Sequence, residues 1–189
     1  MQHTIALALC LCLAAAPSIA APKPHAVAHV SGLDGAKLGT VEFAQTGHGV
    51  LITYDLRGLS PGAHAIHIHT SGNCDAKTKF TSAGPHFSED PAKLHGYMAK
   101  GGPHAGDLPN EFAAADGTLH ASTIGTMFSL GNGKKSIFDR DGAAIIVHAR
   151  ADDYASQPAG NSGDRVACGV IVRTVGPRPR KGAKRNTHK

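Results

Sequence analysis

Short segments in which apolar and polar residues alternate run through most of this chain, and turn-forming residues separate them. A period of two is typical of half-buried β-strands, and no segment shows the period of a helix of three turns. We expect strands at residues 25–31, 39–44, 50–56, 63–70, 117–122, 143–148 and 166–174. Regularly spaced short strands predict an all-β sandwich or barrel.

Residues 1–20 contain no Lys, Arg, Asp or Glu, and their apolar run ends in small residues near Ala20. This pattern predicts a cleaved signal peptide, because the run is too short to span a bilayer. The positive charge that usually precedes such a run is missing, so a disordered or membrane-tethering N-terminus is the alternative. We therefore expect a periplasmic or secreted protein with no transmembrane segment in its mature form.

Residues 176–189 hold six Lys and Arg and no acid, whereas the whole chain has 19 basic and 14 acidic residues. The net charge of +5 therefore belongs to this segment, and the expected β-domain, residues 21–175, is nearly neutral. A segment of this composition is predicted to be a disordered basic tail. It could attract an anionic surface, but a solvated tail is the simpler interpretation, and no pattern indicates specific nucleic-acid binding.

Signal cleavage would leave two cysteines, Cys74 and Cys168, which lie 94 residues apart. In an oxidising compartment a lone pair of cysteines tends to form a disulfide. Closing a loop of this length stabilises the fold by about 4–5 kcal/mol at most. Two free, buried thiols are the alternative.

The chain has 13 histidines, more than a plain surface needs. His67 and His69 lie in one predicted strand and, two residues apart, point to the same face. This spacing alone is a moderate indication of metal binding, and two exposed histidines on a polar face are the alternative. His148 ends a later apolar strand and would supply a further ligand.

A second group of metal-binding residue types lies in residues 71–110, a stretch without sustained periodicity. A structureless loop of this length is uncommon in a compact domain unless it is functional or disordered. The group comprises His86, His95, His104 and Asp107. Three imidazoles and a carboxylate suit tetrahedral zinc, and the glycines and prolines beside them allow the loop to bend so that they converge.

Five blocks of this sequence, together, resemble the signature segments of copper–zinc superoxide dismutases of the bacterial periplasmic type. The blocks are GAHAIHIH, SAGPHF, GPHAGDLPN, IIVHARADD and GNSGDRVACGVI, in the family's order and across most of residues 60–173. The resemblance implies an eight-stranded Greek-key flattened β-barrel, sandwich-like, with long metal-binding and electrostatic loops. It also implies one copper and one zinc per subunit, and conversion of superoxide into dioxygen and hydrogen peroxide.

The same resemblance implies roles for individual residues. The positions that match copper ligands are His67, His69, His86 and His148. The positions that match zinc ligands are His86, His95, His104 and Asp107, so His86 would bridge the two metals. Asp152 matches a carboxylate that hydrogen-bonds a ligand of each metal, and Arg165 matches the arginine that guides superoxide. Cys74 and Cys168 match the family's disulfide, while His64 matches a structural position.

The sequence departs from the eukaryotic pattern between Asp153 and Arg165, where it has no Lys or Glu, so the usual charged steering set is absent. Lys77 and Lys79 could compensate, and two solvated lysines are the alternative. Whether the protein is a monomer or a homodimer is open. Two other functions use the same ligands, namely a non-catalytic carrier of copper and zinc and an adhesin-like β-sandwich with structural zinc.

Overall fold

The computed structural model describes residues 25–174, so the predicted signal peptide, residues 1–20, and the predicted tail, residues 176–189, lie outside the described residues. The strands are β1 His25–Gly32, β2 Lys37–Thr46, β3 Gly49–Leu56, β4 Gly62–His64, β5 Ile66–His69, β6 Glu111–Ala113, β7 Leu119–Gly125, β8 Ala144–His148 and β9 Arg165–Thr174. Within this range the helices are two 3-10 turns, η1 Ala76–Thr78 and η2 Thr81–Ala83. None of the described helices has the length and apolar character required to cross a bilayer.

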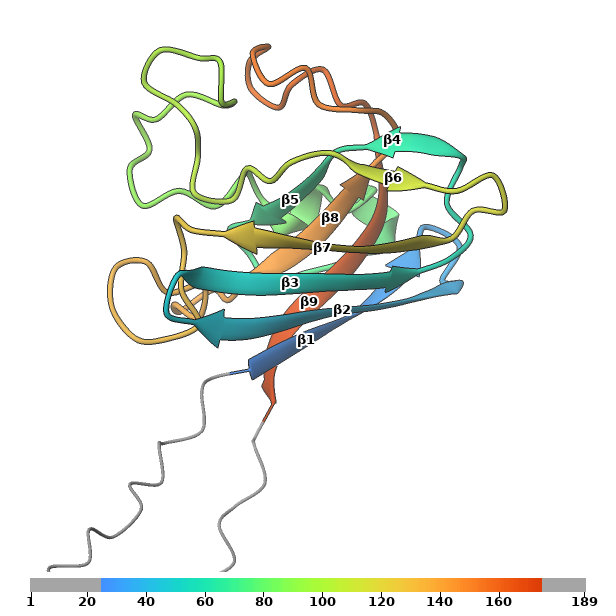
Figure 1. Cartoon of the computed structure of the whole chain (residues 1–189), viewed down its shortest axis with the longest axis horizontal. Helices are drawn as coiled ribbons and strands as arrows, with labels where there is room; N and C mark the ends of the chain where they lie inside the picture. Colours follow the sequence, from blue (N-terminus) through green and yellow to red (C-terminus); the bar gives the residue numbers. More distant parts are fainter. Residues whose placement is uncertain (1–24, 175–189) are drawn as a thin grey trace, which may run out of the picture.

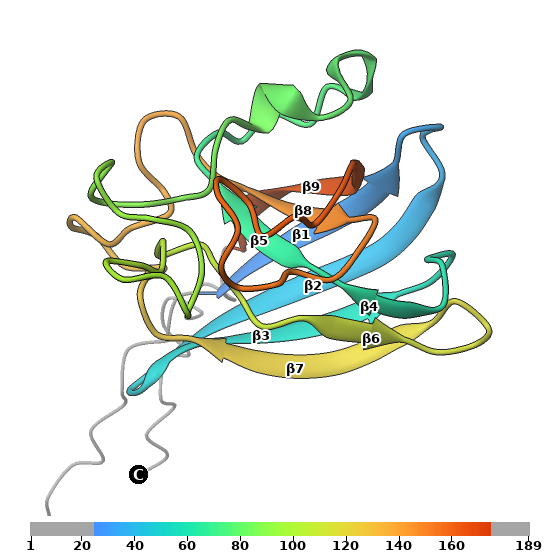
Figure 2. The same ribbon diagram turned by 90° about the horizontal axis from the view of Figure 1, so that it is seen from above.

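Seven strands form one antiparallel sheet in the order β5-β8-β9-β1-β2-β3-β7, and β4 and β6 form a separate two-stranded sheet. The large sheet curls into a half-barrel (Figures 1 and 2), with the β4–β6 pair between its edge strands β5 and β7. β1 lies beside β9, its most distant strand in sequence, and such non-consecutive neighbours are typical of Greek-key folds. The predicted fold class is confirmed.

The described residues form nine strands, against the eight that the resemblance implies, and they exceed the seven segments predicted from alternation for two reasons. The run 63–70 divides at Ala65, because β4 pairs with β6 whereas β5 pairs with β8. The short strand β6 was not predicted, because its three residues include an exposed Phe112 and show no alternation. The other predicted strands are all present, with bounds that differ by one to three residues.

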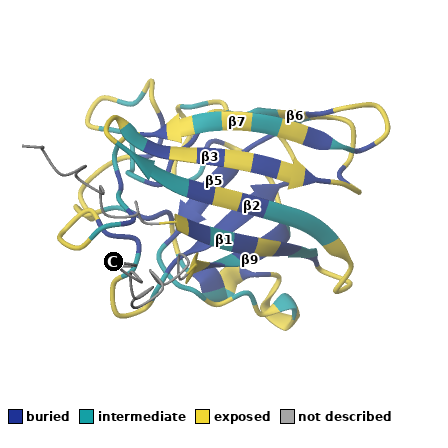
Figure 3. Ribbon diagram, turned by 60° about the horizontal axis from the view of Figure 1, so that its bottom comes forward, coloured by how far each residue is buried: buried dark blue, intermediate teal, exposed yellow. Residues whose placement is uncertain are grey.

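Alternate residues of the strands fill the interior of the half-barrel. In β3, Ile52 and Tyr54 are buried, whereas Thr53 between them faces solvent, and Figure 3 shows this alternation along the strand. Each fully buried aliphatic or aromatic side chain contributes about 1.5–3 kcal/mol. Strand β8 is buried on both faces, since Ile145 and Val147 face the main core and Ile146 packs against Phe80 of the loop that follows β5.

A disulfide between Cys74 and Cys168 joins that loop to β9, which confirms the predicted bond and excludes two free thiols. The regular structure in residues 71–110 is limited to η1, η2 and isolated bridges, which agrees with the lack of periodicity in this stretch. Their path is therefore fixed by this bond, by Phe80 in its small core and by main-chain hydrogen bonds with β5.

Candidate metal centre

Strands β5 and β8 bring the first group of histidines together. They pair antiparallel, with His67 opposite Ile146, and His148 follows at the end of β8. His67 and His69 point to the same face, and both are fully buried, so the alternative of two exposed histidines is wrong. Ile66 and Ile68 face the main core on the other side.

The loop after β5 folds back onto that strand through its main chain. Phe87 N–H donates to the Ile68 carbonyl at 2.7 Å, and Ile68 N–H donates to the Gly106 carbonyl at 2.9 Å. A side chain at position 106 would overlap the Ile68 carbonyl, so this approach requires glycine. These bonds place His86 and Asp107, the neighbours of Phe87 and Gly106, beside the histidines of β5.

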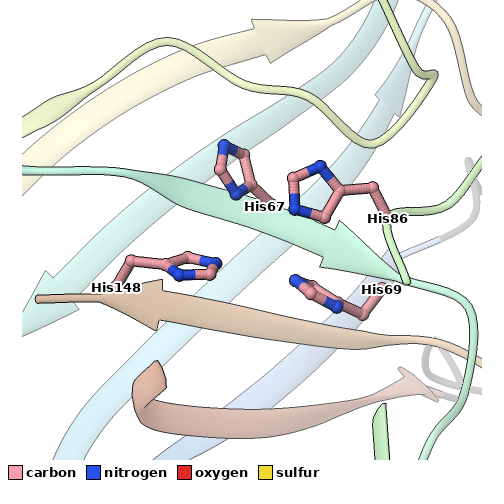
Figure 4. Close-up of side chains that lie close together, drawn as sticks. All are labelled: His67, His69, His86 and His148. Carbon is pink, nitrogen blue, oxygen red and sulfur yellow. The ribbon is translucent and has the colours of Figure 1, made fainter. Parts of the chain in front are cut away.

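The first donor set contains four imidazoles, those of His67, His69, His86 and His148 (Figure 4), and one nitrogen from each ring lies within 4.8 Å of the other three. One buried nitrogen of each ring has no hydrogen-bond partner among the described residues, namely His67 Nδ1, His69 Nε2, His86 Nε2 and His148 Nε2. Buried polar atoms normally have a partner, and four such nitrogens at one place fit a shared cation. Four imidazole nitrogens suit Cu(II).

The opposite nitrogen of each of these rings is engaged, which sets the orientation of the ring. His67 Nε2 donates to Asp152 at 2.9 Å, and His69 Nδ1 donates to the Gly84 carbonyl at 2.8 Å. His148 Nδ1 lies 3.1 Å from the Ser162 hydroxyl, and His86 Nδ1 lies 2.7 Å from Asp107. Metal-binding histidines are typically held through the second nitrogen in this way.

Burial keeps three of these rings neutral, those of His69, His86 and His148. Desolvation lowers the pKa of His86 to about 4, although its hydrogen bond with Asp107 opposes that shift. Desolvation also lowers the pKa of His148 to about 3 and that of His69 well below its ordinary value. At neutral pH the three rings therefore present lone pairs, as a metal ligand must.

The second donor set consists of His86, His95, His104 and Asp107. Asp107 Oδ1 lies 2.7, 3.1 and 3.5 Å from Nδ1 of His86, His95 and His104, respectively. The other carboxylate oxygen, Oδ2, accepts the main-chain N–H groups of Gly96 and His104, each at 2.9 Å. One carboxylate oxygen and three Nδ1 atoms thus converge, and this donor set fits tetrahedral zinc.

Carboxylates on both sides of His95 make this place favourable for positive charge. His95 Nε2 lies 3.0 Å from Asp152 Oδ1, opposite its contact with Asp107. Burial alone would lower the pKa of His95, but the hydrogen bonds with Asp107 and Asp152 raise it to about 9. Burial alone would raise the pKa of Asp107, yet the hydrogen bonds with His86, His95 and Gly96 lower it overall.

Arg165 begins β9 and is fixed by two carbonyls, those of Phe80 at 2.7 Å and Gly84 at 2.8 Å. The Gly84 carbonyl also accepts from His69, so one peptide group connects the guanidinium to the first donor set. Arg165 lines a surface hollow of about 290 Å³ together with Lys79, whereas Lys77 is not among the residues that line it.

Two residues outside the donor sets, His64 and Ser162, contact His148. His64 lies between the carbonyls of His148 and Ser60, each 2.7 Å from a ring nitrogen, which suits its expected structural position. The sequence did not single out Ser162, which is buried beside His148. Its only signal was its place inside the block GNSGDRVACGVI.

Comparisons with known proteins agree with this geometry. Residues 37–171 match the family model described as copper/zinc superoxide dismutase (SODC). A Cu-Zn superoxide dismutase of Caulobacter vibrioides is 43% identical over 148 residues, which cover 77% of this chain and 84% of that protein. Superoxide dismutase [Cu-Zn] 2 of Aquifex aeolicus is 41% identical over 151 residues, which cover 79% and 86%.

A similar solved structure is that of a superoxide-dismutase-like protein from Bacillus subtilis. It has a TM-score of 0.73 and 36% sequence identity, and the match covers 77% of this chain and 97% of that chain. The family implies copper and zinc, and the two donor sets have the residue types that these metals use. This chain belongs to the copper/zinc superoxide dismutase family.

Proposed function

We propose that this protein dismutates superoxide, converting two superoxide anions and two protons into dioxygen and hydrogen peroxide. The observation that carries the proposal is the position of one ring, His86, between the two donor sets. Its Nε2 belongs to the four-imidazole set and its Nδ1 belongs to the set around Asp107. A ring in this position could hold an ion at each nitrogen, so His86 would couple a redox ion to a structural ion.

In this proposal the residues that hold copper are His67, His69, His86 and His148, and those that hold zinc are His86, His95, His104 and Asp107. Bound copper would supply one-electron exchange with superoxide, and zinc, which has no redox chemistry, would fix the shared ring. Asp152 supports both sets, since its two oxygens accept hydrogen bonds from His67 and His95.

Peroxide formation requires protons, and the chain offers His86 Nε2 as a place to hold one. This nitrogen is buried and has no partner among the described residues. The opposite nitrogen stays within 2.7 Å of Asp107, so the ring keeps its orientation whether or not Nε2 carries a proton. We infer that Nε2 is protonated between the two half-reactions and gives that proton to the product.

Positive charge near the first donor set would attract a small anion such as superoxide. Arg165 supplies a fixed positive charge beside this set. Desolvation is the main cause of the lowered pKa of His69 and His148, and the charge of Arg165 lowers both further. Lys79 lines the same hollow as Arg165 and adds a second positive group. We propose that these two residues attract superoxide electrostatically and that Lys77 takes no part.

We also propose that the protein acts outside the cytoplasm, where it would protect the cell from superoxide. The disulfide between Cys74 and Cys168 supports this proposal, because such bonds persist in oxidising compartments. Residues 1–20 would then be a signal peptide, removed on export. Mass measurement of the protein isolated from a periplasmic or secreted fraction tests this, and a chain that retains residues 1–20 would contradict it.

Metal quantification combined with a xanthine-oxidase-coupled assay tests the activity. Metal-free protein should be inactive, zinc alone should not restore activity, and copper with zinc should restore it fully. Binding of both metals without activity would instead indicate a carrier of copper and zinc. Binding of zinc alone, without visible copper absorption, would indicate a structural zinc protein.

A further inference from the structure

The segment after Asp152 packs backbone to backbone against the segment that carries His95. Met98 N–H donates to the Tyr154 carbonyl at 3.0 Å. Gly96, in the same segment as Met98, has a φ of 94°, and a side chain at this position would overlap the Tyr154 carbonyl. The two loops therefore meet at a distance that only glycine permits at this position.

One side chain of the later loop holds the main chain of His95 on both sides. His95 N–H donates to Gln157 Oε1 at 2.9 Å, and Gln157 Nε2 donates to the His95 carbonyl at 2.8 Å. This pair of bonds is the arrangement that an adjacent β-strand would offer. Gln157 Nε2 also donates to the Ala155 carbonyl at 3.0 Å, which ties the carboxamide to its own loop.

The ring of His95 has strong partners, and the N–H and carbonyl of its own main chain have Gln157 as theirs. The ring touches Asp107 through Nδ1 and Asp152 through Nε2. The backbone lies in residues 88–104, which form no strand or helix. Gln157 adds a direct restraint on the main chain of His95, which should resist movement of this ligand away from the ion.

We propose that Gln157 is a positioning residue for zinc. Its carboxamide holds the main chain of His95 and thereby slows release of the ion from the second donor set. The inference rests on the proposed function, since it takes zinc as the ion of that set. It assigns a task to the segment between Asp153 and Arg165, which has no Lys or Glu. That segment holds a ligand in place instead of supplying steering charges.

Zinc transfer from the copper- and zinc-loaded full chain to a coloured chelator tests the proposal. Loss of groups that orient a metal ligand typically weakens binding about 10- to 100-fold, so Gln157→Ala should release zinc about 10-fold faster or more. Gln157→Glu keeps the acceptor for His95 N–H but loses the donor, so it should also release zinc faster than the natural protein. The copper content of both variants should stay unchanged.

Gln45→Ala is the matched control. Gln45 likewise bonds the main chain, accepting from Leu130 N–H at 2.9 Å and donating to the Gly49 carbonyl at 3.2 Å, but it contacts neither donor set. This variant should melt at a lower temperature and release zinc at the natural rate.

Three results would overturn the inference: natural zinc release from Gln157→Ala, equal acceleration in Gln45→Ala, or copper loss in proportion to zinc. If the natural protein took up no zinc at all, that result would contradict the proposed function, and the inference that rests on it would fail as well.

Discussion

Asp152 accepts a hydrogen bond from Nε2 of His67 at 2.9 Å, and this bond leaves Nδ1 of the same ring facing the other three imidazoles of the first donor set. The second oxygen of Asp152 lies 3.0 Å from His95 Nε2 in the other set. A single buried carboxylate therefore orients one histidine of each set. Both sets depend on a residue that belongs to neither of the proposed ligand groups.

We predict that Asp152→Ala weakens binding of both copper and zinc by about 10- to 100-fold, because two ligands lose the group that orients them. Competition titration with chelators for each metal measures this. Asp153→Ala is the control, since the side chain of Asp153 is exposed and bonds only within its own loop, to residues 155 and 156. Loss of a single metal, or equal losses in the control, would contradict the shared role.

The division of ligands predicts opposite outcomes for two histidine variants. His148→Ala removes a donor of the first set only, so copper occupancy and activity should fall while zinc stays bound. His104→Ala removes a donor of the second set only, so zinc should fall at least about tenfold more than copper. Elemental analysis of dialysed protein measures both metals. Parallel loss of both metals in each variant would argue against two separate sites.

Arg165→Ala should slow turnover by about tenfold at low ionic strength while copper stays bound, because the fixed charge beside the first donor set is removed. The difference from the natural protein should shrink as salt is added, since salt screens the attraction. Unchanged rates at low ionic strength would show that Arg165 does not guide the substrate.

Lys79→Ala should give a smaller decrease, about twofold, with the same dependence on salt. Lys77→Ala is its control, because Lys77 is exposed on the same loop but does not line the hollow that Arg165 and Lys79 share. Equal rates for the two lysine variants would remove Lys79 from the proposed approach path.

Tyr54 lies in the core with a hydroxyl that has no partner among the described residues. An unpaired buried hydroxyl costs about 1–3 kcal/mol, so Tyr54→Phe should be as stable as the natural protein or more stable. Desolvation raises the pKa of Tyr54 well above its ordinary value, and the nearby Glu111 adds to this.

That raised pKa gives a defined pH dependence. Above about pH 10 the unfolded chain ionises Tyr54 while the folded chain does not, so the free energy of unfolding should fall with rising pH. Tyr54→Phe should show a shallower decline in denaturant titrations from pH 8 to pH 11. Identical slopes for the two proteins would contradict the assignment to Tyr54.

Local patterns in the sequence were sufficient where structure depends on near neighbours. The period of two predicted β1, β3 and β9 to within about one residue, because burial of one strand face forces that alternation. The spacing of His67 and His69 placed both rings on one face for the same reason. The roles of single residues came from the resemblance to a family, which no periodicity supplies.

Contacts between segments that are distant in sequence could not be predicted from local patterns. Strand β6 pairs with β4, and its three residues have no recognisable pattern of their own. Gln157 bonds the main chain of His95, 62 residues earlier in the sequence. A glutamine is common in polar loops, so its residue type does not indicate this role. Such contacts depend on where two loops meet in the folded chain, so they become visible only in three dimensions.

The shared ring of His86 is tested most directly by a crystal structure of the oxidised, fully metal-loaded protein, with anomalous data collected at the copper and zinc edges. Our account predicts a copper peak beside Nε2 of His86 and a separate zinc peak beside Nδ1. A ring that contacts only one ion, or that has turned toward solvent, would contradict it.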